Sequence, residues 1–397
     1  MTSLTRITLL VSLALLAGPR ARALELEVTG LDGKALRGRL VQVWPEIVLA
    51  SAEGETALAW PHVLMLRPLD VDLPAAESAP AGPLRFELAD GSVFAGRIAG
   101  VTERGFTVEL PAGQRCQLEP TLLRAVHSTS ASAAAQARLV AVATDANRSE
   151  DVAVVERGRR VIELRGAVRR IDSQGVLFAW NERELSLPWE RVAGVSFARP
   201  TARRASSTVR LRGGDVFCGR VIAGDESAIT LQSGVFERLE LEWSRIDRIE
   251  CHSRQLVFLS DLVPLRYEFT PFFLKHWDYA RDKTLTGRAI RLAGRRHGKG
   301  LTMHSRASLA YSLDGQYRQF AALVGIADEM ANRGDVTLAV LGDGRILWQA
   351  SSVRGGEPPR EVLVDVTGVR ELSLHVDFGA GLDVSDHVSW AGARLIR

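Results

Sequence analysis

The sequence predicts an all-β protein in which several small β repeats precede a larger two-sheet sandwich or jelly roll. Short alternating stretches such as 106–110 and 229–231 are separated by Gly, Asp and Ser, which is typical of short strands joined by tight turns. A glycine motif recurs through the first 250 residues, as in repeat proteins. From about residue 257, short strand-like segments are punctuated by Asp-Gly turns, and this rhythm favours a sandwich.

The first 23 residues have the pattern of a secretory signal peptide. Arg6 precedes an apolar run from Ile7 to Ala17, and Gly18-Pro19 then leads to the small-x-small site Ala21-Arg22-Ala23. An uncleaved membrane anchor is the alternative, although the run is only half of the roughly 20 residues that span a bilayer. The pattern predicts a secreted or periplasmic protein with no transmembrane segment after residues 1–23.

The composition excludes a largely disordered chain and gives no indication of a nucleic-acid partner. The chain is 46% hydrophobic and 24% charged, with a formal net charge of +3, as in ordinary globular proteins. Three cysteines, Cys116, Cys218 and Cys251, are too few for a disulfide scaffold or a tetrahedral zinc site. Two interpretations stay open: Cys218 and Cys251 pair in an oxidising compartment, or all three are buried thiols.

Four copies of a glycine motif divide the N-terminal part into repeats. The motif is Asp-Gly or Gly-Gly, four residues, then Gly-Arg, and a degenerate copy keeps only the later glycine. The copies lie at Asp32-Gly33 and Gly38-Arg39, Asp90-Gly91 and Gly96-Arg97, Gly213-Gly214 and Gly219-Arg220, and at Gly166. The first pair suits a tight hairpin and the later glycine suits a sharply bent strand. The predicted units, 24–70, 84–128, 138–198 (degenerate) and 208–252, loosely resemble Sm-like and SH3-like small five-strand β-barrels.

A large apolar residue follows the later glycine of each repeat by 22 to 24 residues, at Trp60, Leu118, Trp189 and Trp243. This register predicts core side chains that open the last strand, and each indole N–H then needs a backbone acceptor. The stretches 71–83, 129–137 and 199–207 have linker composition, which predicts separately packed units. We interpret the repeats as a spacer or assembly module.

The region 253–397 carries a series of segments that follow one another in a recognisable order. They are Lys299 to Ser305, Tyr311 to Phe320, Val324 to Ile326, Leu341 to Arg345, Val364 to Val369 and Asp386 to Leu395. At these residues the sequence resembles the NPCBM family of carbohydrate-binding modules. The resemblance implies a galactose-binding-like β-sandwich, with loops at one end that can hold a sugar and a structural calcium ion.

The predicted ligand-binding residues of this sandwich are His304, His387 and Trp390. The family motif places His387 directly after Asp386, and Trp390 follows three residues later. A sugar site needs a flat aromatic face and a few directional polar groups. The alternative is that Trp390 and His304 are buried supports of the last strand.

The predicted calcium ligands are Asp377, Asp383 and Asp386, on a glycine-rich stretch between two strands. Calcium takes about six to eight oxygen ligands, which carboxylates and loop carbonyls can supply. The alternative is that Asp383 and Asp386 form Asx turns, or that Asp386 caps the final strand.

The predicted function is that of an exported, non-catalytic carbohydrate-binding or cell-envelope adhesion protein, with a glycan or an envelope polysaccharide as its partner. The alternative is a structural module that binds other proteins and no glycan. No enzyme is predicted, because His304, Ser305 and Asp386 lack the nucleophile elbow of hydrolases and no strand-end carboxylate pair accompanies them.

Overall fold

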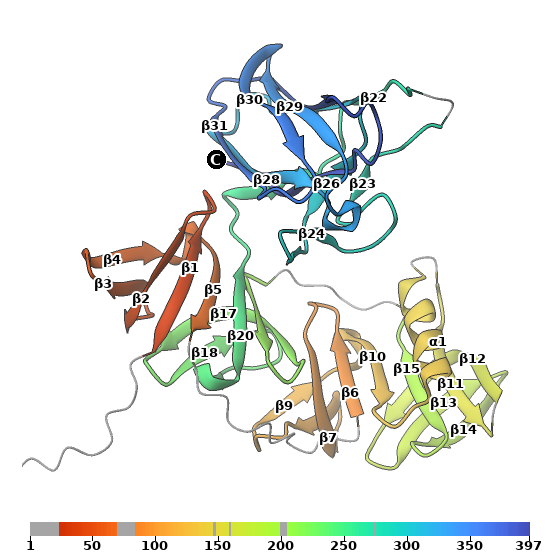
Figure 1. The fold of residues 1–397 in the computed structure, drawn as a ribbon. Helices are drawn as coiled ribbons and strands as arrows, with labels where there is room; N and C mark the ends of the chain where they lie inside the picture. Colours follow the sequence, from red (N-terminus) through yellow and green to blue (C-terminus); the bar gives the residue numbers. More distant parts are fainter. Residues whose placement is uncertain (1–23, 70–83, 146–147, 159, 199–204, 273–274) are drawn as a thin grey trace, which may run out of the picture.

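The computed structural model describes residues 24–69, 84–145, 148–158, 160–198, 205–272 and 275–397. The predicted signal peptide (1–23), the whole stretch 71–83 and most of 199–207 lie outside these residues. The described chain is nearly all β, with four five-strand units followed by a two-sheet sandwich (Figure 1). The predicted fold class is therefore confirmed.

The four units share one antiparallel topology, in which the first strand pairs with the second and the fifth and the others follow in sequence. The first unit contains β1 (Glu25–Gly30), β2 (Ala35–Gln42), β3 (Glu46–Ser51), β4 (Gly54–Ala59) and β5 (Val63–Leu69). The second contains β6 (Leu84–Leu88), β7 (Val93–Thr102), β8 (Gly105–Glu109), β9 (Arg115–Leu118) and β10 (Leu123–Ser128). The third contains β11 (Asp151–Arg157), β12 (Arg160–Ile171), β13 (Gly175–Trp180), β14 (Arg183–Pro188) and β15 (Val192–Ser196). The fourth contains β16 (Ser207–Leu211), β17 (Val216–Gly224), β18 (Ala228–Gln232), β19 (Leu239–Glu242) and β20 (Ile246–Cys251).

The later glycine of each repeat lies where two strands approach closely. A Cβ atom at this position would collide with the neighbouring strand, which explains why glycine recurs there. The carbonyl oxygens in the way are those of Ala50 for Gly38, Glu109 for Gly96, Ala179 for Gly166 and Gln232 for Gly219. The turn glycines Gly33, Gly91 and Gly214 have φ values of 92°, 96° and 88°, in the region that favours glycine.

The repeat tryptophans hold the turn that leads into the last strand of their unit. Trp60 and Trp243 begin the 3₁₀ turns η1 (Trp60–His62) and η3 (Trp243–Arg245). As predicted, each indole N–H donates to a backbone carbonyl: Trp60 to Val43 at 3.0 Å, Trp189 to Asp172 at 2.9 Å and Trp243 to Asp225 at 2.9 Å. Leu118 differs, because it ends β9 and precedes the turn η2 (Pro120–Leu122).

The units pack against one another, so the prediction of separately packed repeats is wrong. Strand β20 pairs with β5 of the first unit, and β10 pairs with β15 of the third. Phe94 of the second unit stacks on Phe217 of the fourth, with ring centroids 5.5 Å apart. One apolar core runs through all four units. Strand edges that are far apart in the sequence make these contacts, so the composition of the linkers gives no indication of them.

A helix also replaces most of one predicted linker. Helix α1 (Ala133–Thr144) begins after Ser132, whose hydroxyl accepts a hydrogen bond from the Ala135 N–H, a standard N-cap. Leu139 and Val142 bury the helix against Val152 and Val154 of the third unit. The three cysteines are buried free thiols, so the structure contains no Cys218–Cys251 disulfide.

The C-terminal sandwich consists of two antiparallel sheets. One has the order β23 (Ala280–Arg281), β26 (Gly300–Met303), β33 (Val388–Ile396), β28 (Gln319–Ile326), β31 (Arg360–Asp365), and β21 (Leu256–Phe258) also pairs with β33. The other has the order β22 (Arg266–Phe269), β27 (Ala307–Ser312), β32 (Glu371–Phe378), β29 (Asp335–Gly342), β30 (Arg345–Arg354). The short turns η4 (Leu259–Asp261) and η5 (Asp328–Met330) and the hairpin β24 (Ile290–Leu292)–β25 (Arg295–His297) complete the domain. Tyr311, Phe320 and Trp390 are among its buried core residues.

The first unit docks on the sandwich beside the C-terminal strand β33 (Figure 1). The buried Arg394 donates from Nε to the Leu31 carbonyl at 2.7 Å, and burial lowers the pKa of its guanidinium to about 10. Leu31 also packs against Ala321 and Ile396. This contact joins the first unit to the last strand of the sandwich.

A fragment starting near residue 253 is expected to fold alone, because the sandwich core is separate from the core of the repeats. Without the Leu31 contact, its unfolding midpoint should lie below that of the sandwich in the full chain. Arg394→Met in the full chain should lower the sandwich transition in calorimetry, since a hydrogen bond to a charged group contributes about 1.5–3 kcal/mol. The exposed Arg345→Met is the matched control. An insoluble fragment without cooperative unfolding would contradict this domain division.

Candidate functional site

Three aromatic rings meet at one end of the sandwich. The Trp277 ring is stacked on His304, with centroids 5.2 Å apart and an interplanar angle of 4°. His387 meets Trp277 edge-on at 5.1 Å and lies 5.3 Å from His304. The register of β26 and β33 explains the pairing, because Met303 lies opposite Val388 and the two histidines continue these strands. The structure thus brings together the predicted residues His304 and His387.

Trp277 is the residue of this cluster that sequence reasoning missed. It lies in an aromatic-rich stretch after β22, where the Tyr267 hydroxyl donates to the Trp277 carbonyl at 2.7 Å. The Lys275 ammonium lies over the half-buried indole, 3.6 Å from its centroid. Because Lys275 is exposed, and a cation–π contact of this kind contributes only about 0.5–1 kcal/mol, a ligand can displace it from the ring.

Two buried polar atoms beside these rings have no hydrogen-bond partner among the described residues, namely His387 Nδ1 and Glu329 Oε1. They lie 3.9 Å apart, on side chains that are 9% and 10% exposed. The other oxygen of Glu329 accepts a hydrogen bond from the Thr286 hydroxyl at 2.7 Å. Buried unpaired polar atoms are costly, so this pair has a hydrogen-bonding capacity that the described residues leave unused.

The charge state of His387 fits an uncharged ligand. Burial, and next the neighbouring His304, lower the pKa of His387 to about 4. The imidazole is therefore neutral at physiological pH, with one nitrogen that donates and one that accepts. Beside the acceptor Glu329, a neutral ring can recognise an uncharged hydroxyl.

Asp386 is buried and supports the site through hydrogen bonds, but it does not line the site. The residue is 0% exposed, and its carboxylate accepts hydrogen bonds from the Ser305 hydroxyl at 2.6 Å and from the Asp335 N–H at 3.2 Å. Burial raises the pKa of this carboxyl to about 6. Asp386 thereby fixes the start of β33, and with it the neighbouring His387.

The predicted calcium set is not assembled. The described residues contain no group of three His, Cys, Asp or Glu side chains placed to hold a metal ion. Asp377 accepts a hydrogen bond from the Phe378 N–H and lies 3.6 Å from the Arg306 guanidinium, while Asp386 points inward. Asp383 lies half-buried on the loop. Calcium binding at this loop stays a prediction.

Trp390 belongs to the core, which overturns its prediction as a ligand-binding residue. It is 0% exposed and meets Trp348 edge-on, with ring centroids 6.4 Å apart. The side chain points between the sheets because Trp390 follows the buried Val388 by two residues on β33, and side chains alternate along a strand. The alternative interpretation, a buried support of the last strand, is the one that the structure shows.

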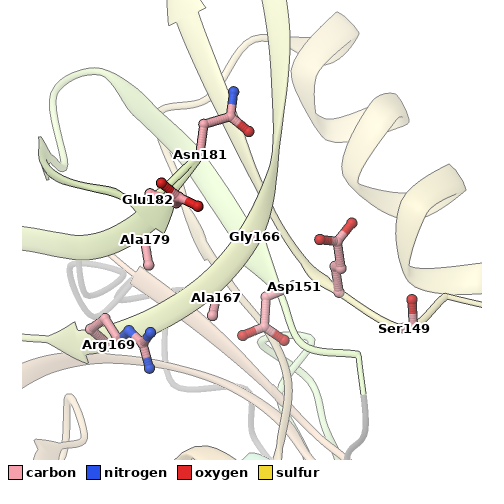
Figure 2. Close-up of a pocket in the computed structure, with 9 residues that line it drawn as sticks. Ser149, Asp151, Gly166, Ala167, Arg169, Ala179, Asn181 and Glu182 are labelled. Carbon is pink, nitrogen blue, oxygen red and sulfur yellow. The ribbon is translucent and has the colours of Figure 1, made fainter.

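A separate cavity of about 430 Å³ lies in the third unit (Figure 2). Its lining includes Asp151, Arg169, Asn181 and Glu182 and contains no aromatic side chain. The Asp151 carboxylate already accepts hydrogen bonds from the N–H groups of Val168 and Ala198. The described side chains of this cavity offer neither a stacking face nor an unpaired buried group.

Comparison with known proteins agrees with the fold of the C-terminal part, since residues 256–396 match the family model described as "NPCBM/NEW2 domain". The C-terminal sandwich is an NPCBM/NEW2 domain. A curated protein of Renibacterium salmoninarum with the name "Putative endo-alpha-N-acetylgalactosaminidase" is 28% identical over 110 residues. That match covers 28% of this chain but only 7% of the relative, so the chain spans a small part of that protein.

Two solved structures of Clostridium perfringens proteins are similar to parts of the chain. One is the CBM51 module of GH95 in complex with methyl-galactose, 26% identical, covering 35% of this chain and 99% of that one, with a TM-score of 0.33. The other contains CBM51-2 in complex with GlcNAc and the INT domains of ZmpB, 22% identical, covering 48% and 40%, with a TM-score of 0.34. The likeness of the repeats to Sm-like and SH3-like barrels stays a prediction. No described helix is long and apolar enough to cross a membrane.

Proposed function

We propose that the NPCBM/NEW2 domain binds a neutral glycan at the site formed by Trp277, His304, His387 and Glu329. The observation that carries the proposal is the pair of buried, unpartnered polar atoms of His387 and Glu329 beside an aromatic face. A sugar presents the same two kinds of surface, since its C–H groups pack on an aromatic ring and its hydroxyls form hydrogen bonds.

In the proposed complex, the ring C–H groups of one sugar residue pack on Trp277 after Lys275 has moved aside. One hydroxyl donates to Glu329 Oε1 and accepts a second hydrogen bond from His387 Nδ1, which then carries the proton of the neutral ring. The stacked His304 fixes the plane of the indole, so that little order has to be gained on binding.

The proposed role is binding without catalysis. Ser305 donates its hydroxyl to Asp386, and both residues are 0% exposed. His304 uses Nδ1 for the Ser305 backbone carbonyl at 2.7 Å. His304, Ser305 and Asp386 are thus engaged in holding the loop, and the proposed protein is an exported glycan-binding or envelope-adhesion protein whose repeats space or assemble the domain.

The test is a panel of immobilised neutral glycans ending in galactose, N-acetylgalactosamine or N-acetylglucosamine, probed with the full chain. The expected result is retention by at least one of them, competed by the free sugar at millimolar concentration. If the protein is retained by none of the glycans, the proposal is rejected and a module that binds proteins only is favoured.

A further inference from the structure

The hairpin β24–β25 and the loop before it form a strongly basic surface. From Lys283 to Gly300 the chain has six basic residues and no acidic one. Among the described residues, only Lys299 of these six forms an ion pair, with Asp261 and Asp282. The other five are exposed without an ion-pair partner there: Lys283, Arg288, Arg291, Arg295 and Arg296. We call these five residues the basic hairpin surface.

The strand register places two of these arginines directly opposite each other. Arg291 pairs with Arg296 across the hairpin. Ile290 and Leu292, on either side of Arg291, are 0% and 1% exposed, so the arginine pair lies on the outer face. Like charges directly opposite on paired strands destabilise the pairing. An anion held between the two guanidinium groups would remove the repulsion and gain charge-assisted hydrogen bonds.

The hairpin is anchored to the same short turn that supplies Glu329 to the glycan site. The N–H groups of Ala293 and Gly294, at the hairpin tip, donate to Asp328 of η5, each at 2.8 Å. Thr286, in the preceding loop, donates to Glu329 itself. The basic hairpin surface therefore adjoins the proposed glycan site through η5, and one extended polymer can contact both.

We propose that the basic hairpin surface binds the carboxylate groups of an acidic polysaccharide, a polymer with uronic acid residues, while an uncharged part of the same chain occupies the Trp277 site. This inference rests on the proposed glycan-binding function and names the class of polymer. Arginine is suited to the task because its planar guanidinium matches a carboxylate with two parallel hydrogen bonds.

The test compares two forms of one polymer in which uronic acid and neutral sugar residues alternate, hyaluronan with free carboxylates and the same chain with its carboxylates methyl-esterified. The full-length protein is expected to bind the free acid at least about tenfold more tightly at low salt, and the preference should shrink as salt screens the charges. Arg291→Gln/Arg296→Gln should abolish the preference, whereas the exposed pair Arg318→Gln/Arg345→Gln should keep it. The hairpin variant removes a like-charge pair, so its unfolding midpoint should not fall.

Two results would overturn the inference: equal affinity of the native protein for both polymer forms, or an unchanged preference in Arg291→Gln/Arg296→Gln. Equal binding of a DNA oligonucleotide of similar charge would also overturn it, because the surface would then be a general polyanion site. Failure of the proposed function gives a different signature, in which Trp277→Ala leaves the affinity for both polymers unchanged.

Discussion

Replacing Trp277 by alanine is expected to weaken glycan binding by the full chain roughly thirtyfold. The indole is the flat face of the site and is held between His304 and the displaceable Lys275. Central aromatic residues of binding sites typically contribute about 2 kcal/mol or more, and about 1.4 kcal/mol is a tenfold change in Kd. Titration calorimetry with the best glycan of the panel measures the loss.

The matched control is Trp44→Ala in the first unit, where the indole is 39% exposed. This variant should bind the glycan with the affinity of the native protein. Trp277 is half-buried at the end of the sandwich, so the unfolding midpoint of each variant must be recorded as well. A Trp277→Ala protein that keeps both its fold and its affinity would rule out the proposed stacking face.

Asp386→Ala is expected to destabilise the sandwich by about 3 kcal/mol, while Asp386→Asn should stay within about 1 kcal/mol of the native protein. Alanine leaves the buried Ser305 hydroxyl and Asp335 N–H without their acceptor, and each such loss costs about 1–3 kcal/mol. Asparagine keeps the size and one acceptor, and it has no charge to bury. Urea unfolding of the three proteins at neutral pH tests the difference.

The same variants should change how stability depends on pH. The pKa of Asp386 is raised from 3.8 to about 6, so between these values the folded state holds a proton that the unfolded state has lost. The contribution of Asp386 to the free energy of unfolding therefore falls as the pH rises from about 4 to about 6. His387 acts in the opposite sense, because its pKa is lowered from 6.5 to about 4 and the unfolded state binds the extra proton.

Asp386→Asn removes only the first of these opposing contributions. The stability of this variant should therefore rise more steeply between pH 4 and pH 6 than that of the native sandwich. Glu361→Gln, at an exposed position of β31, is the control and should follow the native curve. Equal stability of Asp386→Ala and the native protein would contradict the structural role given to this carboxylate.

The sequence could predict the repeats because local geometry alone dictates their key residues. Gly38 and its counterparts avoid a collision with the next strand, and Trp60, Trp189 and Trp243 each need a nearby carbonyl. The contacts between units could not be predicted from the sequence. Phe94 and Phe217 are separated by more than a hundred residues. Taken alone, the sequence around each ring predicts a core residue of its own unit.

The candidate site could be predicted only in part. His304 and His387 follow from motifs that flank two paired strands. Trp277 lies in a stretch with many aromatic residues, where nothing distinguishes a half-buried ring from a core ring. Glu329 is one of two adjacent carboxylates after a strand, and its significance arises only from the unpaired His387 nitrogen beside it. Asp386 is among the predicted calcium ligands, and its burial could not be predicted because the sequence of a glycine-rich loop does not show which side chains point inward.

The indole N–H spectrum of the full-length protein, titrated with the glycan selected by the panel, tests the central claim most directly. The account predicts that the Trp277 signal shifts in proportion to site occupancy, while the signals of the buried Trp390 and of the repeat tryptophans stay in place. Shifts confined to Trp60, Trp189 or Trp243, with Trp277 unmoved, would contradict it, because the glycan would then bind the repeats and not the end of the sandwich.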